Sequence, residues 1–189
     1  SSEKSHSILC ILVNGRIELF TPANHIGLIW NFQVSPSSCG NHEHYEQYIK
    51  LCAADDQGAG RGTTHIFLTE SDGSEHVAGF ITLRASTLTK EFNGVIYGEP
   101  AIEISELAVD ASYAGNGIGR ILVDFAIAKA DMLNCEHLGI RYIVVCSDPQ
   151  SVGFYEKCKF TRLSDAGRVP REGWNEDCIP LFLKLPNAF

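Results

Sequence analysis

The sequence lacks any apolar run long enough to cross a membrane. Its first such run, Ile8 to Val13, is far shorter than the roughly 20 residues that a spanning helix needs. No secretory signal is visible, and residues 1–7 (SSEKSHS) are interpreted as a tag remnant or a disordered start. The sequence therefore predicts a protein without membrane contact.

Paired cysteine motifs are also absent. The seven cysteines are odd in number and form no C-x-x-C pair. They are Cys10, Cys39, Cys52, Cys135, Cys146, Cys158 and Cys178. This pattern favours reduced thiols in a cytoplasmic protein over a disulfide framework. Cys146 ends the apolar run IVVC, which predicts an inert thiol packed in a buried strand.

Basic residues are scarce, because 15 Lys and Arg stand against 23 Asp and Glu and give a formal net charge of −8. Sequence-independent binding to nucleic acid requires clustered positive charge, so this balance weighs against a nucleic-acid partner. One segment departs from the trend, and its bases are Lys157, Lys159, Arg162, Arg168 and Arg171. Asp165 is the only acid in that segment. If the protein binds a nucleic acid such as tRNA, we expect this segment to contact it.

Several nucleotide- and metal-binding motifs are missing. The chain has no Gly-Lys-Ser/Thr sequence, which excludes a Walker A loop. Arg120 and Leu122 stand where a dinucleotide-binding G-x-G-x-x-G motif would need its third glycine. Cys39, His42 and His44 have no fourth metal ligand at a recognisable spacing, and they are interpreted as the solvated start of a helix. No metal site is predicted.

The chain does contain the strand and helix patterns of a single α/β (α+β) domain over residues 8–189, with a mixed central sheet flanked by helices. Predicted strands lie around the Asn14-Gly15 turn, on both sides of the Asp72-Gly73 turn, and over residues 101–110, 141–147 and 178–185. Predicted helices cover Asn41–Asp55, about 117–132 and 149–158. A chain of 189 residues is long enough to bury one proper core.

Three glycines, Gly115, Gly117 and Gly119, occupy alternate positions between a predicted strand and a predicted helix. Such a loop exposes backbone N–H groups beside the positive end of the helix dipole, with no side chains to block a close approach. The loop is therefore suited to a pyrophosphate group. A glycine-rich turn ahead of a surface helix is the alternative interpretation.

The residues around this loop resemble the GNAT superfamily of acetyl-CoA-dependent N-acyltransferases. The resemblance rests on ISELAVDASYAGNGIGRIL and the later IVVCSDPQSVGFYEKCKF, and it is specific over residues 102–160. Three positions depart from the family pattern, since Ala114 replaces the usual Arg or Gln, Asp148 replaces an Asn, and Lys159 replaces a Gly. The upstream stretch SCGNHEHYEQYIKLCAADDQGAGRGTTHIFL looks like the N-terminal helix and second strand of the GNAT toxins of toxin-antitoxin pairs.

The resemblance implies an acetyl-CoA site without a metal cofactor. The pantetheine arm would lie beside the predicted strand, bonded to its main chain. The pyrophosphate would accept N–H bonds from the glycine loop, with the Arg120 side chain as an additional contact. The implied cofactor-binding residues are Leu107, Ala108, Val109, Gly115, Asn116, Gly117, Ile118, Gly119 and Arg120. The missing side chain at Ala114 should weaken this site without abolishing it.

The resemblance also implies two catalytic residues. Tyr155 matches the tyrosine that protonates the departing thiolate, and Glu103 matches the glutamate that some members use as the base. The alternatives are an amphipathic core tyrosine and a solvated strand carboxylate. Strand alternation predicts that Glu103 shares a face with Ser105 and Leu107, and that Glu106 points to the opposite face.

The sequence thus predicts an acetyl-CoA-dependent N-acetyltransferase that moves an acetyl group directly to a primary amine of a small molecule or peptide. Two alternatives stay open. One is a toxin-like enzyme that acetylates aminoacyl-tRNA, and the other is a non-catalytic acyl-CoA-binding module, suggested by the departures at Ala114 and Lys159. The predicted partners are acetyl-CoA and an amine acceptor, with no membrane, and a homodimer is compatible with the sequence.

Overall fold

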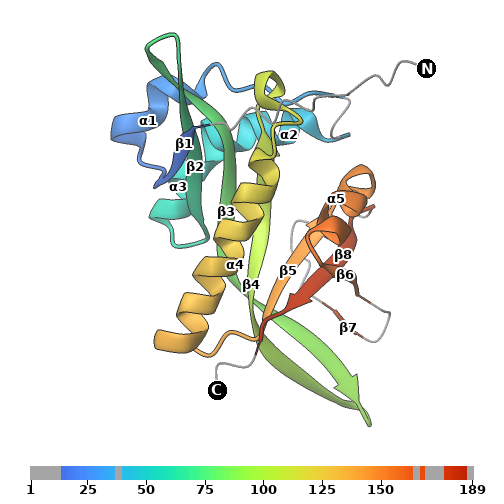
Figure 1. Ribbon diagram of the computed structural model, residues 1–189. Coiled ribbons are helices and arrows are strands. Elements are labelled where there is room, and N and C mark those ends of the chain that lie inside the picture. Colours follow the sequence, from blue (N-terminus) through green and yellow to red (C-terminus); the bar gives the residue numbers. More distant parts are fainter. Residues whose placement is uncertain (1–13, 37–39, 164–166, 169–176, 187–189) are drawn as a thin grey trace, which may run out of the picture.

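The computed structural model describes residues 14–36, 40–163, 167–168 and 177–186 (Figure 1). The strands are β1 Gly15–Leu19, β2 Thr63–Ser71, β3 Ser74–Phe92, β4 Val95–Val109, β5 Tyr142–Ser147, β6 Thr161–Arg162, β7 Gly167–Arg168 and β8 Ile179–Lys184. The α-helices are α1 Pro22–Ile29, α2 His42–Gln47, α3 Ala53–Gly58, α4 Ile118–Glu136 and α5 Val152–Lys157. A π-helical segment, η1 Tyr48–Cys52, joins α2 to α3, and the 3-10 turns η2 Ala111–Tyr113 and η3 Pro149–Ser151 precede α4 and α5.

The strands of the described residues form one eight-stranded sheet in the order β1-β2-β3-β4-β5-β8-β6, with β7 paired to β3. The paired strands are antiparallel except for β4 and β5, which run parallel. The helix α4 lies between β4 and β5 in the chain, as a parallel connection requires. This mixed sheet with its flanking helices confirms the predicted fold class.

Helices cover both faces of the sheet (Figure 1). The core on the α4 and α5 face includes Ile81, Ile104, Leu122, Val145 and Tyr155. The core on the α1 and η1 face includes Phe20, Ile29, Phe32, Ile49 and Phe80. Successive strand residues point to opposite faces, so the neighbours Phe80 and Ile81 belong to different cores. The sheet therefore separates two apolar cores, one on each of its faces.

The local predictions agree with the structure at most elements. The Asp72-Gly73 turn joins β2 to β3, and both residues have the positive φ, 53° and 73°, that a tight hairpin turn of this kind needs. The predicted helix over residues 41–55 is present as α2, η1 and α3 in succession. For the hairpin predicted at Asn14-Gly15, the first arm lies outside the described residues, and the second is β1, which pairs with β2.

The strand β4 contains a bulge that overturns one prediction. Thr82 on β3 pairs with Glu106, and the next residue, Leu83, pairs with Ile104, so Ser105 is skipped. An extra residue in one strand reverses the alternation beyond it. Glu106 therefore lies on the same face as Glu103, and the prediction that they point to opposite faces is wrong.

A disulfide joins Cys146 on β5 to Cys178, immediately before β8, with a Cα–Cα distance of 5.4 Å. It contradicts the expectation of reduced thiols, and of an inert thiol at Cys146 in particular. The antiparallel pairing of Ser147 with Ile179 brings the two cysteines together, although 32 residues separate them in sequence. Cys52, Cys135 and Cys158 are free thiols in the structure. Cys10 and Cys39 lie outside the described residues.

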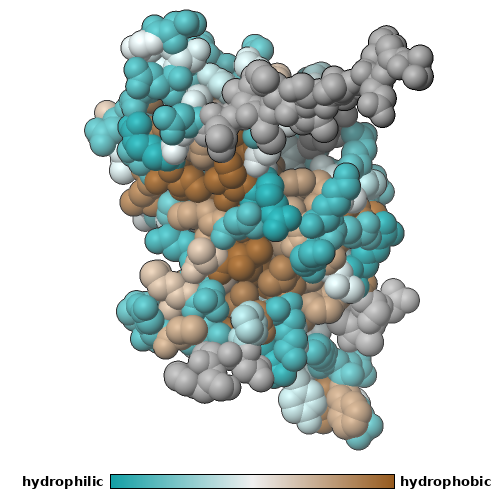
Figure 2. Space-filling model, in the orientation of Figure 1, coloured by the Kyte–Doolittle hydropathy of each residue, from teal (hydrophilic) through white to brown (hydrophobic). Residues whose placement is uncertain are grey.

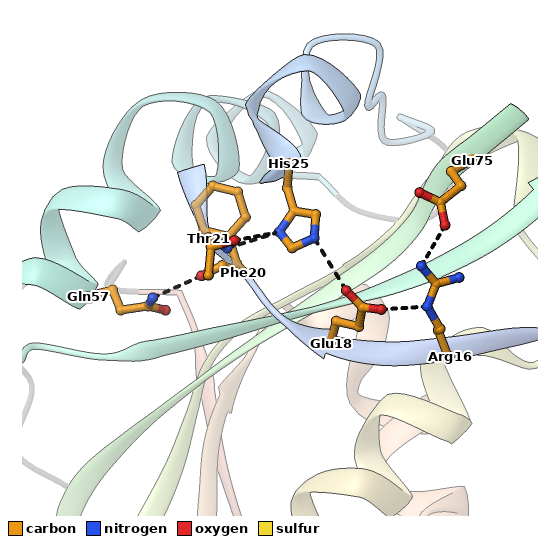
Figure 3. A network of polar contacts seen from close by, with 7 residues as sticks. All are labelled: Arg16, Glu18, Phe20, Thr21, His25, Gln57 and Glu75. Atoms are coloured by element: carbon orange, nitrogen blue, oxygen red, sulfur yellow. Dashed lines mark hydrogen bonds and ion pairs between the residues drawn. The ribbon is translucent and has the colours of Figure 1, made fainter. Parts of the chain in front are cut away.

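A polar network fixes α1 to the edge of the sheet (Figure 3). His25 is buried, and its Nδ1 accepts a hydrogen bond of 3.0 Å from the Thr21 N–H at the start of α1. Its Nε2 lies 3.5 Å from Oε2 of Glu18, which also bonds Arg16. Both ring nitrogens thus have partners, and His25 serves to position α1.

Hydrophobic side chains also reach the surface, notably at the end of the hairpin formed by β3 and β4 (Figure 2). There, Phe92, Val95, Ile96 and Tyr97 are exposed. Within the described part of the chain, none of the helices combines the length and the apolar character that a membrane span requires.

Candidate active site

A cleft opens where β4 and β5 separate. The two strands pair from Ala101 with Tyr142 to Ile104 with Val145, and the ladder between them then ends in the described structure. A cavity of about 680 Å³ lies beyond this point. Its walls come from β4, β5, the glycine loop, the start of α4, and α5, with Val34 and Tyr45 added from the opposite face of the sheet. The cleft therefore passes between the strands and connects the two faces.

The three glycines of the loop have two different roles. Gly115 and Gly117 have φ angles of 80° and 81°, in the left-handed region that residues with a Cβ rarely adopt. Gly119 has a different reason to be glycine, because a Cβ there would lie 3.2 Å from Cζ of Phe154. Two glycines shape the turn, and the third allows α4 to approach α5 closely.

Backbone N–H groups without an intrahelical acceptor lie in the cleft wall, at the start of α4. The first residues of a helix have no intrahelical acceptor for their N–H groups, and here these residues are Ile118, Gly119 and Arg120. All three line the cleft. Asn116 differs from the prediction, since its N–H donates to the Tyr113 carbonyl at 3.3 Å, and it is not among the described residues of the cleft wall.

The remaining predicted cofactor-binding residues also line the cleft. They are Leu107, Ala108, Val109, Gly115 and Gly117. The Arg120 guanidinium is at the cleft wall, but it already donates to Oδ1 of Asp124 at 2.9 Å and to the Lys157 carbonyl at 3.3 Å. Its hydrogen bond to Asp124 raises the pKa of Arg120. In this arrangement Arg120 ties α4 to the end of α5.

Tyr155 lies in the cleft wall, on α5. The residue is buried, with its ring centroid 5.0 Å from that of Phe154 and 5.6 Å from that of Phe160. Cys158, one turn further along, also lines the cleft, and burial raises the pKa of its thiol. Tyr155 is thus a core residue and a cleft residue at once.

Glu103 is buried deep in the sheet, with 2% of its surface exposed. This burial excludes the interpretation as a solvated strand carboxylate. Its Oε1 accepts a hydrogen bond of 2.8 Å from the Arg84 guanidinium on the neighbouring strand β3. Glu103 is not among the described residues that line the cleft, although Ile104 and Ser105 are.

A second polar cluster lies where α2 meets the cleft. The Tyr45 hydroxyl donates to Oδ2 of Asp148 at 3.2 Å, and both residues line the cleft. Nε2 of His44 lies 3.0 Å from Oε2 of Glu106, and this hydrogen bond raises the pKa of His44. Sequence reasoning missed the contribution of Val34 and Tyr45 to the wall. No local signal could have found it, because it depends on how α2 packs over the sheet.

The model of the acetyltransferase (GNAT) family matches residues 26–160. The chain belongs to the GNAT family. Members of this family are acyltransferases, and the chain is accordingly an enzyme of that class. The search of curated proteins found no match.

Several solved GNAT toxin structures share the fold. A tyrosine-to-phenylalanine mutant of KacT is 19% identical, with a TM-score of 0.70, covering 90% of this chain and 95% of that one. AtaT complexed with acetyl-methionyl-tRNAfMet is 19% identical, with a TM-score of 0.68 and the same coverage of 90% and 95%. AtaTR bound with acetyl-CoA is 21% identical, with a TM-score of 0.66, covering 91% and 94%.

Two hydrogen-bonded carboxylates hold the α2 side of this GNAT cleft in place. Asp110, at the end of β4, accepts hydrogen bonds from the Gln33 N–H at 2.9 Å and the Ser112 N–H at 2.8 Å. Glu46, on α2, accepts one from the Val34 N–H at 2.8 Å. The segment that carries Val34 is therefore pinned to both the sheet and α2.

One of the departures from the GNAT pattern has a structural cost. Lys159 follows α5 with a φ of 73°, a left-handed conformation in which glycine is favoured. Its N–H donates to the Glu156 carbonyl at 3.0 Å, as in a helix-ending turn. The usual glycine of the family thus corresponds to a real backbone requirement, which this chain meets with a lysine.

Proposed function

We propose that this protein is an acetyl-CoA-dependent N-acetyltransferase that acetylates a primary amine by direct transfer. The observation that carries the proposal is the cleft between β4 and β5, which brings the glycine loop and Tyr155 into one wall. Helix N–H groups suited to phosphate and a buried phenol suited to proton donation thus share a single cavity.

Acetyl-CoA would supply the acetyl group and a thiolate leaving group. The N–H groups of Ile118, Gly119 and Arg120 would bind the pyrophosphate, and the β4 main chain near Leu107 and Val109 would bind the pantetheine arm. AtaTR has been solved with acetyl-CoA, which supports a cleft of this fold as an acetyl-CoA site. The described residues contain no group of metal ligands, and the proposal requires none.

In the proposed reaction, the amine nitrogen attacks the thioester carbonyl carbon, a C–N bond forms and the C–S bond breaks. The Tyr155 hydroxyl donates its proton to the departing sulfur. The amine must lose a proton to a base, a role that the family resemblance gives to Glu103. Because Tyr155 is largely buried, its hydrogen bond to the sulfur would form in a medium of low dielectric, where such bonds are stronger.

A small molecule or peptide amine is the proposed acceptor, because the chain is acidic overall. Aminoacyl-tRNA is a second candidate, favoured by the AtaT structure with acetyl-methionyl-tRNAfMet. Within the predicted basic segment, Lys157 lines the cleft, whereas Arg162 pairs with Glu156 at 2.8 Å. Arg171 lies outside the described residues, as does the side chain of Arg168.

Thermal shift with acetyl-CoA, CoA and NAD at matched concentrations tests the cofactor. A ligand at about 100 times its Kd stabilises a protein by roughly 2.7 kcal/mol, a measurable shift. We expect both CoA species to stabilise the protein and NAD to have no effect. Absence of a shift with either CoA species would overturn the proposed function.

The Tyr155→Phe variant distinguishes a catalytic protein from a module that only binds acyl-CoA. We expect this variant to bind acetyl-CoA like the parent and to lose turnover in a screen of primary amines and aminoacyl-tRNA. Unchanged turnover would remove Tyr155 from its proposed role. A parent that binds acetyl-CoA but acetylates no acceptor would favour the non-catalytic module.

A further inference from the structure

The bulge at Ser105 turns a second carboxylate toward the α2 side of the sheet. Glu106 shares a face with Glu103, but the two have different surroundings. The Glu103 side chain is 3% exposed and bonded to Arg84, whereas that of Glu106 is 15% exposed and bonded to His44. The imidazole of His44 is itself half-exposed. The carboxylate of Glu106 is thus linked to an imidazole that has access to water.

This His44–Glu106 pair lies beside the cleft: neither residue is among the described residues that line it, but each has a chain neighbour that does. His44 directly precedes Tyr45, with the two rings 5.3 Å apart, and Tyr45 lines the cleft together with Asp148. Glu106 is flanked by Ser105 and Leu107, which also line it. Figure 1 shows α2 near the upper end of β4, the end whose residues line the cleft.

The pair and Tyr155 approach the cleft from opposite faces of the sheet. Tyr155 belongs to the core under α4 and α5, whereas Tyr45 packs on the core under α1 and η1. With Tyr155 donating its proton to the departing sulfur from one face, an amine that enters beside α2 would reach the thioester carbonyl carbon from the other face. A base on the α2 side would then lie next to that amine.

We propose that His44 is the catalytic base of this enzyme and that Glu106 is its positioning residue. The proposal deepens the proposed function and rests on it. Glu106 accepts the Nε2–H of His44, which leaves the lone pair on Nδ1 to take a proton from the acceptor ammonium. The neutral amine then forms the C–N bond, the C–S bond breaks, and Tyr155 protonates the sulfur. The attacking nitrogen still carries one proton more than an amide, and this proton returns through solvent to the Tyr155 phenolate. His44 releases its own proton to water.

The charges around His44 suit this role. Glu106 on β4 and Asp148 after β5 both favour its protonated form, and the ring of Tyr48 lies 6.3 Å away. Arg84 on β3 interacts with both Glu103 and Glu106. The hydrogen bond to Glu106 is the main cause that raises the pKa of His44 above its ordinary value. His25, by contrast, is buried with both nitrogens engaged within its own network.

The test compares two acceptors that differ in whether a base is needed. Glycinamide has an α-amine, with a pKa of about 8, and is mainly an ammonium at pH 7. Hydroxylamine is already neutral at that pH. The variants are His44→Gln, Glu106→Gln and Glu103→Gln. His137→Gln is the matched control, since His137 forms an exposed pair with Glu136 at the end of α4.

We expect His44→Gln to lower kcat with glycinamide about 100-fold, to spare transfer to hydroxylamine, and to bind acetyl-CoA like the parent. Glu106→Gln should move the acidic limb of the kcat/KM profile to lower pH, because the anion that holds the proton on His44 is lost. His137→Gln should leave both acceptors unaffected.

Equal losses with both acceptors would show that His44 is structural, and would overturn the proposal. A selective loss of glycinamide transfer confined to Glu103→Gln would overturn it in favour of Glu103. If the parent acetylates none of the tested acceptors, including the two amines and aminoacyl-tRNA, the proposed function is refuted. The proposal for His44 then fails with it.

Discussion

Gly119 at the start of α4 packs closely against Phe154 on α5: a Cβ on Gly119 would lie 3.2 Å from Cζ of Phe154. Phe154 precedes Tyr155, and the two rings meet edge-on with their centroids 5.0 Å apart. The proposed phosphate-binding helix start and the proposed catalytic tyrosine are therefore connected through one aromatic ring.

Gly119→Ala should raise the Kd for acetyl-CoA about tenfold. The added methyl group projects into the cleft wall and pushes Phe154, while the better helix propensity of alanine, worth about 1 kcal/mol, offsets much of the packing cost to stability. Calorimetric titration with acetyl-CoA and thermal melting measure the two effects separately. Combining Gly119→Ala with Phe154→Leu should restore binding, and a double variant no better than the single one would contradict this coupling.

Lys159→Gly should stabilise the protein by about 1 kcal/mol, because it relieves the left-handed backbone at this position. For a domain of this size, the expected rise in Tm is roughly 2–4 °C. Lys159→Ala is the matched control, since it removes the same charge but keeps the Cβ. If the alanine variant gains as much as the glycine variant, the effect comes from charge and not from φ.

Ala114→Arg should tighten CoA binding about tenfold, an effect of about 1.4 kcal/mol. Ala114 lines the cleft at the start of the glycine loop. A guanidinium at this position could form charge-assisted hydrogen bonds with phosphate oxygens. The gain should shrink as salt rises, since exposed charges are screened. Ala114→Gln provides the uncharged comparison. An affinity gain that is independent of salt would point to packing and not to a phosphate contact.

The Cys146–Cys178 disulfide should stabilise the segment that carries Tyr155. It closes a loop with a sequence separation of 32 that includes α5, and cross-links of this length contribute roughly 3–4 kcal/mol. Reductant or Cys178→Ser should therefore lower Tm and weaken acetyl-CoA binding, as Cys146 lines the cleft. Cys135→Ser, at an exposed free thiol, is the control. A parent whose Tm is unaffected by reductant would show that the bond does not form in solution.

Local patterns were sufficient to predict the elements that depend on a few neighbouring residues. Hydrophobic periodicity and turn-forming residues predict three such elements: the Asp72-Gly73 turn, the strand ending at Val109 and the helix after Gly117. The glycine loop was also predictable, because its conformation depends on the absence of a Cβ.

Pairings between distant segments could not be predicted in this way. The bulge at Ser105 is a property of two strands, since it exists only relative to Thr82 and Leu83 on β3. Cys146 meets Cys178 only because β8 lies beside β5. The orientation of Glu106 was missed for the same reason, because alternation along β4 alone puts its side chain on the wrong face.

Stability should depend on pH through the His44–Glu106 pair. The pKa of His44 is raised in the folded protein by its hydrogen bond to Glu106, so the pair stabilises the fold fully below the unfolded pKa of about 6.5. That contribution is lost as pH rises through the folded pKa. The Tm difference between the parent and Glu106→Gln should therefore be larger at pH 6 than at pH 9, because the contribution of a protonated His44 falls as pH rises. A difference that is constant across this range, or that grows with pH, would show that Glu106 stabilises the protein through contacts other than a protonated His44.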